Sequence, residues 1–277
     1  MDLYNKTCFA CSKIITNEYS TSFSAGIRAF HPRFHNAIYA IYGFVRYADE
    51  IVDTFHGFDK ASLIADFSKE AFAAINNGVS LNPVLQSFQI VVNRYNIDHG
   101  LIYAFLHSME MDLDNASYCD ERFKEYIYGS AEVVGLMCLR VFCDGDEALY
   151  QQLLPMARSL GSAFQKINFL RDISADYNDL GRTYFPGVNF KQFTETDKLR
   201  IEADIKIDFD NALAGIKQLP KGTRLGVYIA YIYYLQLFKK IRRTSAATIM
   251  QKRIRVSDTQ KMALYIKAVL KQKLNRL

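Results

Sequence analysis

The sequence contains no tryptophan and few of the residues that interrupt helices. Its 277 residues include only 14 glycines and 5 prolines, and the prolines stand where helices are expected to start or stop. Because glycine and proline are the strongest helix breakers, this scarcity favours long helices. Hydrophobic residues make up 50% of the chain and aromatic residues 14%, which suffices for a sizeable core. The composition therefore indicates a globular helical protein and excludes a disordered chain.

The chain also lacks an apolar run long enough to cross a bilayer. The most apolar segment, Leu225–Phe238, is shorter than the ~20 residues that a transmembrane helix needs. The N-terminal MDLYNKTCFACSK has neither the basic nor the apolar region of a signal peptide. We therefore expect a cytoplasmic protein with reduced cysteines. Cys8 and Cys11 form a CxxC, but no second pair of ligands follows, so zinc is not expected.

An excess of positive charge is modest overall and uneven along the chain. The net charge is +5, and basic residues gather in Lys239–Arg243, Lys252–Arg255 and the segment from Lys261 to Arg276. Solvated helix faces account for most of them, and the alternatives are an anionic membrane surface or a phosphate group. No recognition helix or RNP-like motif accompanies them, so nucleic acid is not an expected partner. Peripheral binding to the inner face of the cytoplasmic membrane stays open.

Apolar residues return every three or four positions, and no segment has the alternation of a strand. The sequence thus predicts an all-α fold, and the absence of a Gly-, Ser- or Pro-rich linker predicts one domain over residues 1–277. The expected helices are Asp2–Ala25, Pro32–Thr54, Lys60–Asn76, Pro83–Tyr95, His99–Asp112, Glu121–Phe142, Glu147–Asp176, Glu195–Gln218, Thr223–Arg243 and Asp258–Lys273.

Two pairs of aspartates stand in apolar, helix-prone sequence. Asp49 and Asp53 belong to YADEIVD, and Asp172 and Asp176 belong to NFLRDISAD. A spacing of four residues places both carboxylates of a pair on one helix face. Acids that face an apolar interior resist ionisation unless cations lie between them, so the pattern predicts hard divalent metal, above all Mg²⁺. Such a metal also binds diphosphate groups.

Each pair extends into a longer polar stripe on a helix that is otherwise apolar. We predict that the two stripes face each other across a cavity; the alternative is that each is the solvent face of an amphipathic helix. The stripes comprise Tyr42, Arg46, Asp49 and Asp53 on the first helix, and Gln165, Asn168, Asp172 and Asp176 on the second.

Four segments in this order resemble the squalene and phytoene synthase family. They are YSTSF (19–23), YADEIVD (47–53), YIYGSAEVVG (126–135) and QKINFLRDISADYNDLGRTYFP (165–186). The resemblance covers nearly the whole chain. It implies the all-α class I isoprenoid synthase fold, built around a central cavity, and the head-to-head joining of two prenyl diphosphates.

The resemblance also implies roles for individual residues. Asp49, Asp53, Asp172 and Asp176 would hold several Mg²⁺ ions, which Mn²⁺ could replace, with Asn168 as a further ligand. The diphosphates would be bound by Ser20, Ser22, Arg46, Gln165, Asn168, Arg171 and a basic residue near the C-terminus, either Arg253 or Arg255. Tyr42 and Tyr126 match tyrosines near the reacting carbons, where a ring face stabilises a carbocation. The chain departs from the family pattern at Glu132, Ala175 and Phe185, which leaves the substrate chain length open.

The expected activity is that of a phytoene synthase, which joins two geranylgeranyl diphosphates without NADPH. A dehydrosqualene or squalene synthase acting on two farnesyl diphosphates is the first alternative. A head-to-tail elongase is disfavoured because such enzymes usually carry DDxxD at both sites. A non-catalytic helical assembly factor would be expected to have lost the aspartates, all four of which are present. We expect a monomer or a weak homo-oligomer.

Overall fold

The computed structural model describes residues 1–114, 119–178 and 184–274, and this part of the chain is helical without a strand. The prediction of an all-α fold is therefore confirmed, while that of a single domain stays a prediction. The helices are α1 (Asp2–Tyr19), α2 (Thr21–Arg28), η1 (Pro32–Phe34), α3 (His35–Thr54), α4 (Lys60–Asn77), α5 (Pro83–Tyr95), α6 (His99–Met111), α7 (Asp120–Ile127), η2 (Tyr128–Glu132), α8 (Val133–Cys143), α9 (Glu147–Asn178), η3 (Phe190–Gln192), α10 (Glu195–Ile216), α11 (Lys221–Arg242), α12 (Ala246–Ile249) and α13 (Asp258–Lys273).

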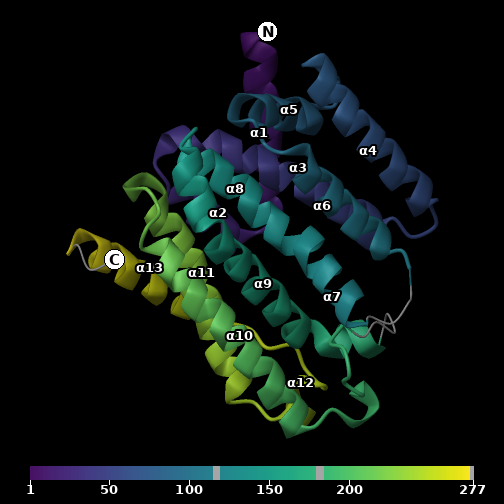
Figure 1. Cartoon of the computed structure of the whole chain (residues 1–277), viewed down its shortest axis with the longest axis vertical. Helices are drawn as coiled ribbons and strands as arrows, with labels where there is room; N and C mark the ends of the chain where they lie inside the picture. Colours follow the sequence, from purple (N-terminus) through teal and green to yellow (C-terminus); the bar gives the residue numbers. More distant parts are fainter. Residues whose placement is uncertain (115–118, 179–183, 275–277) are drawn as a thin grey trace.

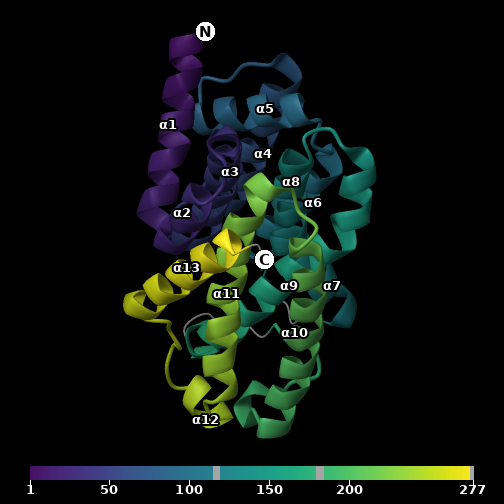
Figure 2. The ribbon, with the colours of Figure 1, turned by 90° about the vertical axis from the view of Figure 1, so that its left-hand side faces the viewer.

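The helices form an elongated bundle (Figure 1). Helix α1 packs on α3 and α5 at the N-terminal end, and α9 packs on α8 and α10. Helices α10 and α12 lie at the opposite end of the molecule. Helix α13 crosses the outer side of α11 (Figure 2), which in turn contacts α2 and α9. Helices α3, α8, α9 and α11 thus enclose the middle of the bundle.

The first predicted helix, Asp2–Ala25, is divided at Ser20. This residue is extended (φ −151°, ψ 102°), and its hydroxyl accepts a hydrogen bond from the backbone N–H of Phe23 at 3.2 Å. Serine is a favoured N-cap because its side chain satisfies an amide that the first turn leaves unpaired. The prediction of one continuous helix was therefore wrong at this point, and the break turns Ser20 toward the interior.

A π-turn, η2, joins α7 to α8 within one continuous helix. Two neighbouring helices approach it closely: a Cβ on Gly129 would lie 2.4 Å from the Ala104 carbonyl oxygen of α6, and one on Gly161 of α9 would lie 2.8 Å from the Ala131 carbonyl oxygen. Glycine is required at both positions because no side chain fits there. The small residues of this segment thus serve helix packing as well as the cavity described below.

By length and composition, one described helix, Asp120–Cys143, could cross a membrane. However, 56% of its most apolar window is buried inside the fold, because α6 and α9 cover it. Core helices of globular proteins have the same character.

Candidate functional site

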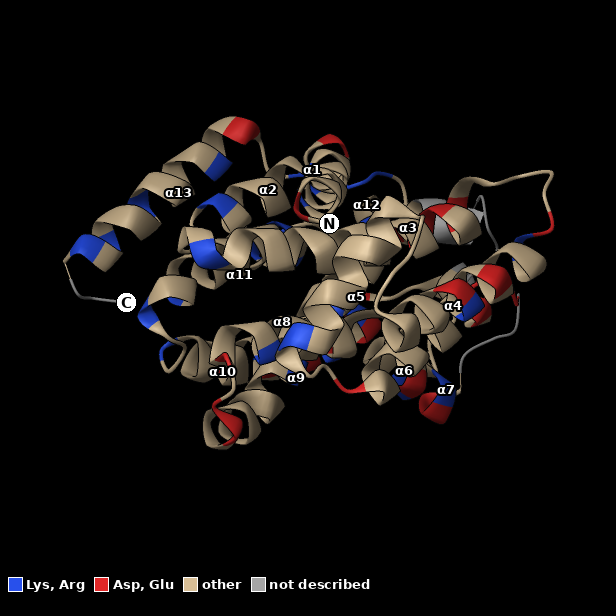
Figure 3. Cartoon of the chain, turned by 90° about the horizontal axis from the view of Figure 1, so that it is seen from above, with Lys and Arg blue, Asp and Glu red and all other residues tan. Residues whose placement is uncertain are grey.

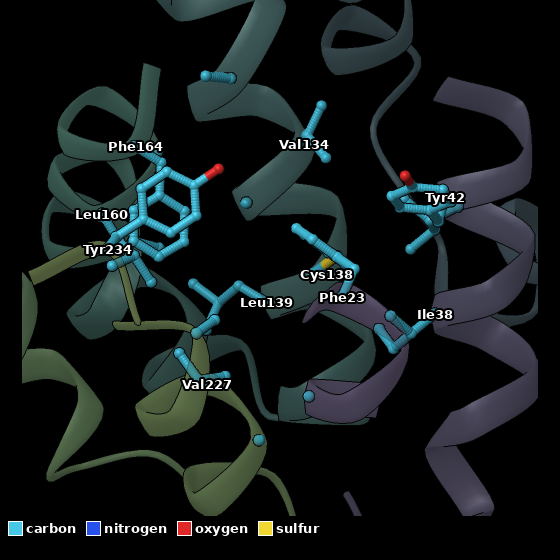
Figure 4. A pocket seen from close by; sticks show the side chains of 18 of the residues that line it. Phe23, Ile38, Tyr42, Val134, Cys138, Leu139, Leu160, Phe164, Val227 and Tyr234 are labelled. Carbon is cyan, nitrogen blue, oxygen red and sulfur yellow. The ribbon is translucent and has the colours of Figure 1, made fainter. Parts of the chain in front are cut away.

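A cavity of about 480 Å³ lies between α2, α3, η2, α8, α9, α10 and α11. Figure 4 shows Tyr42 of α3 on one side of the space and Phe164 of α9 with Tyr234 of α11 on the other. Val134 and Cys138 of α8 lie between them. Most of the lining is aliphatic or aromatic. A long apolar group would therefore find a continuous apolar surface here.

The lining changes from apolar to charged along two helices. On α3 the cavity is lined first by Ile38 and Ile41 and then by Arg46 and Asp49. Helix α9 repeats this order, from Leu153, Met156 and Leu160 to Asn168 and Arg171. The polar residues therefore gather toward the C-terminal ends of both helices, where Ser20 also lines the space. One chamber thus combines an apolar body with a charged end.

Arg46 is the central cation on the α3 side. Its guanidinium forms an ion pair with Glu50 and lies 3.8 Å from the Oδ2 atom of Asp49. It also stacks 4.4 Å from the ring centre of Tyr19. Although burial opposes it, hydrogen bonds from Thr54 and Arg46 lower the pKa of Glu50. The guanidinium is thus held in place by three neighbours, with part of it facing the cavity.

The structure strongly perturbs the ionisation of Asp49. Burial raises its pKa to about 7, and the negative charge of Asp53 adds to the rise while Arg46 opposes it. Asp112, which the sequence analysis missed, also raises the pKa of Asp49. Near neutral pH the carboxyl group is therefore poised between its protonated and ionised forms. Added positive charge at this point would favour the ionised form.

Asp172 is contacted by two guanidinium groups. Arg171 contacts it through Nη2 at 2.5 Å, and Arg253 contacts it through Nε at 2.6 Å. Arg253 belongs to the segment that follows α12, 81 residues further along the chain. With Ser20, Ser22, Arg171 and Arg255 it lines a second, smaller cavity of about 220 Å³. Because Ser20 and Arg171 line both spaces, the two cavities adjoin each other.

Aromatic residues flank the charged end of the main cavity. Tyr42 packs against Phe23 with ring centres 5.1 Å apart, and Tyr234 stacks on Phe164 at 3.9 Å. The Tyr234 hydroxyl donates a hydrogen bond to Oδ1 of Asn168 at 3.2 Å. Burial raises the pKa of both tyrosines, so both phenols stay neutral. Tyr234 was not among the site residues predicted from the sequence.

The remaining predicted residues differ in their distance from this site. Gln165 is joined to Asn168 by a 3.5 Å hydrogen bond between their side chains, and neither cavity has it in its lining. Tyr126 is buried away from both linings, and its hydroxyl donates to Asp112 at 2.9 Å. Asp176 belongs to the last turn of α9, but its side chain lies outside the described part of the chain.

Within residues 1–114, 119–178 and 184–274, no three Asp, Glu, His or Cys side chains gather closely enough to hold a metal ion. The donors of the first acidic pair nevertheless suit a hard divalent cation. Both are carboxylates, and burial together with the neighbouring acids Asp53, Asp112 and Glu50 makes ionisation of Asp49 costly unless positive charge is added. Oxygen donors of this kind are what Mg²⁺ prefers.

Comparisons with known proteins agree with one another. A sequence model described as squalene/phytoene synthase matches residues 16–260. Phytoene synthase 1 of Solanum lycopersicum, a chloroplastic protein, is 27% identical over 265 residues, which are 88% of this chain and 63% of the relative. The 4,4′-diapophytoene synthase of Staphylococcus haemolyticus is 24% identical over 271 residues, 91% of this chain and 92% of the relative.

The fold is shared with a solved structure. The crystal structure of a dehydrosqualene synthase has a TM-score of 0.82 at 21% identity and covers 98% of both chains. The expected isoprenoid synthase fold is thereby confirmed. The chain spans 63% to 66% of the length of three plant relatives that it matches.

Proposed function

The chain belongs to the squalene/phytoene synthase family, and on this premise we propose that it joins two geranylgeranyl diphosphates head to head to form phytoene. The observation that carries the proposal is the change of lining along α3 and α9, from an apolar chamber to Arg46, Asp49 and Arg171. A prenyl diphosphate has the same division between a long hydrocarbon chain and a charged end. Substrate and lining therefore match in polarity.

In the proposed reaction, one substrate loses diphosphate and its allylic cation alkylates the double bond of the second. Loss of a proton closes a cyclopropane ring that still carries one diphosphate. The second diphosphate then leaves, the skeleton rearranges, and loss of a second proton gives the linear hydrocarbon. Each half of the reaction thus releases one diphosphate and one proton. No reductant is needed, so NADPH is not expected as a cofactor.

The residues of this chain would bind, shield and orient the substrates. Arg46 and Arg171 offer planar guanidinium groups that can give two parallel hydrogen bonds to phosphate oxygens. Tyr42 and Tyr234 present neutral rings beside the charged end, where a ring face attracts a carbocation. The apolar lining excludes water, which would otherwise capture the cation.

Mg²⁺ held by the carboxylates of Asp49, Asp53, Asp172 and Asp176 would stabilise the negative charge that develops on the departing diphosphate. Asn168 would be a further ligand. Mn²⁺ is a possible substitute because it accepts the same oxygen donors.

A second candidate is a dehydrosqualene synthase that acts on two farnesyl diphosphates. The diapophytoene synthase relative favours it, because this chain covers 92% of that protein's length. Both reactions use the same site and differ in chain length alone.

Product analysis tests both candidates. The purified protein is incubated with Mg²⁺ and either geranylgeranyl or farnesyl diphosphate, with and without NADPH, and the hydrocarbon is identified by mass spectrometry. A C40 product from the first substrate supports phytoene synthesis, and a C30 product from the second alone supports the alternative. The proposal would be overturned if the native protein formed no hydrocarbon from either substrate and so did not differ from Asp49→Asn.

A further inference from the structure

Helix α13 exposes a row of large apolar side chains. Met262, Ile266 and Leu270 expose 61%, 52% and 55% of their surface, and Leu274, directly after the helix, exposes 63%. Residues four apart lie on one helix face. We name these four residues the outer stripe. Isolated exposed apolar residues are common, but four in a row form a contiguous patch.

The other side of α13 is already in use. Its Ala268 is buried against Ile229 and Tyr233 of α11, and Lys271 donates a 3.1 Å hydrogen bond to the hydroxyl of Tyr228. These contacts fix the rotation of α13 on α11. The outer stripe therefore cannot turn inward without breaking the packing of the opposite face.

Two exposed lysines lie beside the outer stripe. Lys267 follows Ile266 by one position and Lys273 precedes Leu274 by one, which places each about 100° around the helix from that residue. The single acid of α13 is Asp258, in its first turn. Figure 3 shows blue turns along α13, whereas red turns gather on α4, α6 and α7 on the other side of the molecule.

The helix also begins beside the second cavity. Lys261 lines this cavity together with Arg253 and Arg255, and Met262, the first residue of the outer stripe, is its neighbour in sequence. A surface that binds the outer stripe would thus lie next to the second cavity.

We propose that the outer stripe of α13 docks this protein on an anionic lipid bilayer. The helix lies in the plane of the interface, with Met262, Ile266 and Leu270 in the boundary between headgroups and acyl chains and the exposed Lys267 and Lys273 on lipid phosphates. Charge complementarity selects this partner. A second copy of the chain, packed stripe against stripe, would bring two sets of four lysines together with one acid each. The proposal does not depend on the reaction that the protein catalyses.

Vesicle co-sedimentation tests the proposal on the full chain. Vesicles of phosphatidylcholine alone are compared with vesicles that contain one third phosphatidylglycerol, at low and high salt. We expect at least tenfold tighter binding to the anionic vesicles, with a steep loss in high salt. Ile266→Asp should weaken binding about tenfold or more, because it buries a charge in place of an apolar side chain. Lys267→Gln should weaken it about fivefold, from about 1 kcal/mol per charge.

Matched controls separate the stripe from general surface effects. Ile207 of α10 is 61% exposed, so Ile207→Asp makes the same chemical change elsewhere and should bind as the native protein does. Lys217→Gln is the corresponding control for charge. Circular dichroism checks that each variant is folded, and Met262→Gln with Leu270→Gln replaces Ile266→Asp if that variant does not fold.

Several outcomes would overturn the proposal. They are equal binding to neutral and anionic vesicles, no binding to either, and Ile266→Asp binding as tightly as Ile207→Asp. Sedimentation velocity without lipid tests the other occupant: a dimer that Ile266→Asp abolishes would assign the outer stripe to a second copy of the chain.

Discussion

Replacing Asp49 with asparagine should stabilise the metal-free protein at neutral pH. Burial and the charge of Asp53 raise the pKa of Asp49 from 3.8 to about 7, and a rise of that size corresponds to ~4 kcal/mol if it is fully expressed in folding. The side chain exposes 34% of its surface, so solvent screening reduces the effect. We expect a gain of about 1–2 kcal/mol in the free energy of unfolding, or about 2–8 °C in Tm.

The gain should depend on pH with a definite sign. Below about pH 4 the carboxyl group is protonated in both the folded and the unfolded states, so it does not change stability. Between about pH 4 and 7 the unfolded chain releases this proton while the folded protein retains it, and the stability of the native protein falls. Above about pH 7 the loss is complete. Asparagine does not titrate, so its advantage over Asp49 grows across this window and then stays level.

Urea unfolding in EDTA, followed by circular dichroism between pH 4 and 8, measures this difference. Asp66→Asn, on the exposed side of α4, is the control and should leave the free energy of unfolding nearly unchanged. Added Mg²⁺ should stabilise the native protein more than Asp49→Asn. An Asn variant that is less stable than the native protein at pH 8, or a difference that does not change with pH, would refute the reasoning.

Substitutions at four further positions test the site and its packing. Arg171→Lys should lower kcat/KM for the prenyl diphosphate about tenfold or more, because an ammonium group cannot give two parallel hydrogen bonds; unchanged steady-state kinetics would contradict substrate contact. Gly161→Ala should lower the free energy of unfolding by about 1–3 kcal/mol, since its Cβ would lie 2.8 Å from a carbonyl oxygen of η2. Gly26→Ala, whose Cβ meets one atom at 3.5 Å, should be neutral or gain up to ~1 kcal/mol in urea unfolding. Tyr234→Phe removes the hydrogen bond to Asn168 and should lower the free energy of unfolding by about 1 kcal/mol. Tyr234→Leu also removes the ring and should reduce turnover more than Tyr234→Phe does. Equal turnover in the two variants would exclude a role for the ring.

Local spacing predicted part of each polar stripe. On α3, Tyr42, Arg46 and Asp49 line the main cavity, whereas the exposed Asp53 is not in its lining. On α9, Asn168 lines the cavity, whereas Gln165 and Asp172 line neither cavity. Helix geometry places residues three and four apart on one face, but which turns of that face border the cavity depends on how the helices cross.

Contacts between distant segments could not be predicted in this way. The sequence predicted the apolar helix that became α11. This helix contains four tyrosines between positions 228 and 234, which point to different sides of the helix. Which tyrosine meets Asn168 depends on how α11 crosses α9. Asp112 was missed for the same reason, since it follows α6 and reaches the site only through the packing of α6 against η2 and α3.

The two acidic pairs have the same spacing and yet differ in charge balance. Asp49 has one cation nearby, Arg46, which is more closely bound to Glu50. Asp172 has two, because Arg171 precedes it in sequence and Arg253 reaches it from beyond α12. Within the described part of the chain, one end of the site therefore has a carboxylate whose neighbouring arginine is more closely bound to another acid, and the other end has guanidinium groups beside a cavity that favours an anion. A metal diphosphate contains both charges. The repeated motif supplies the carboxylates, but the tertiary placement of arginines gives each pair its own role.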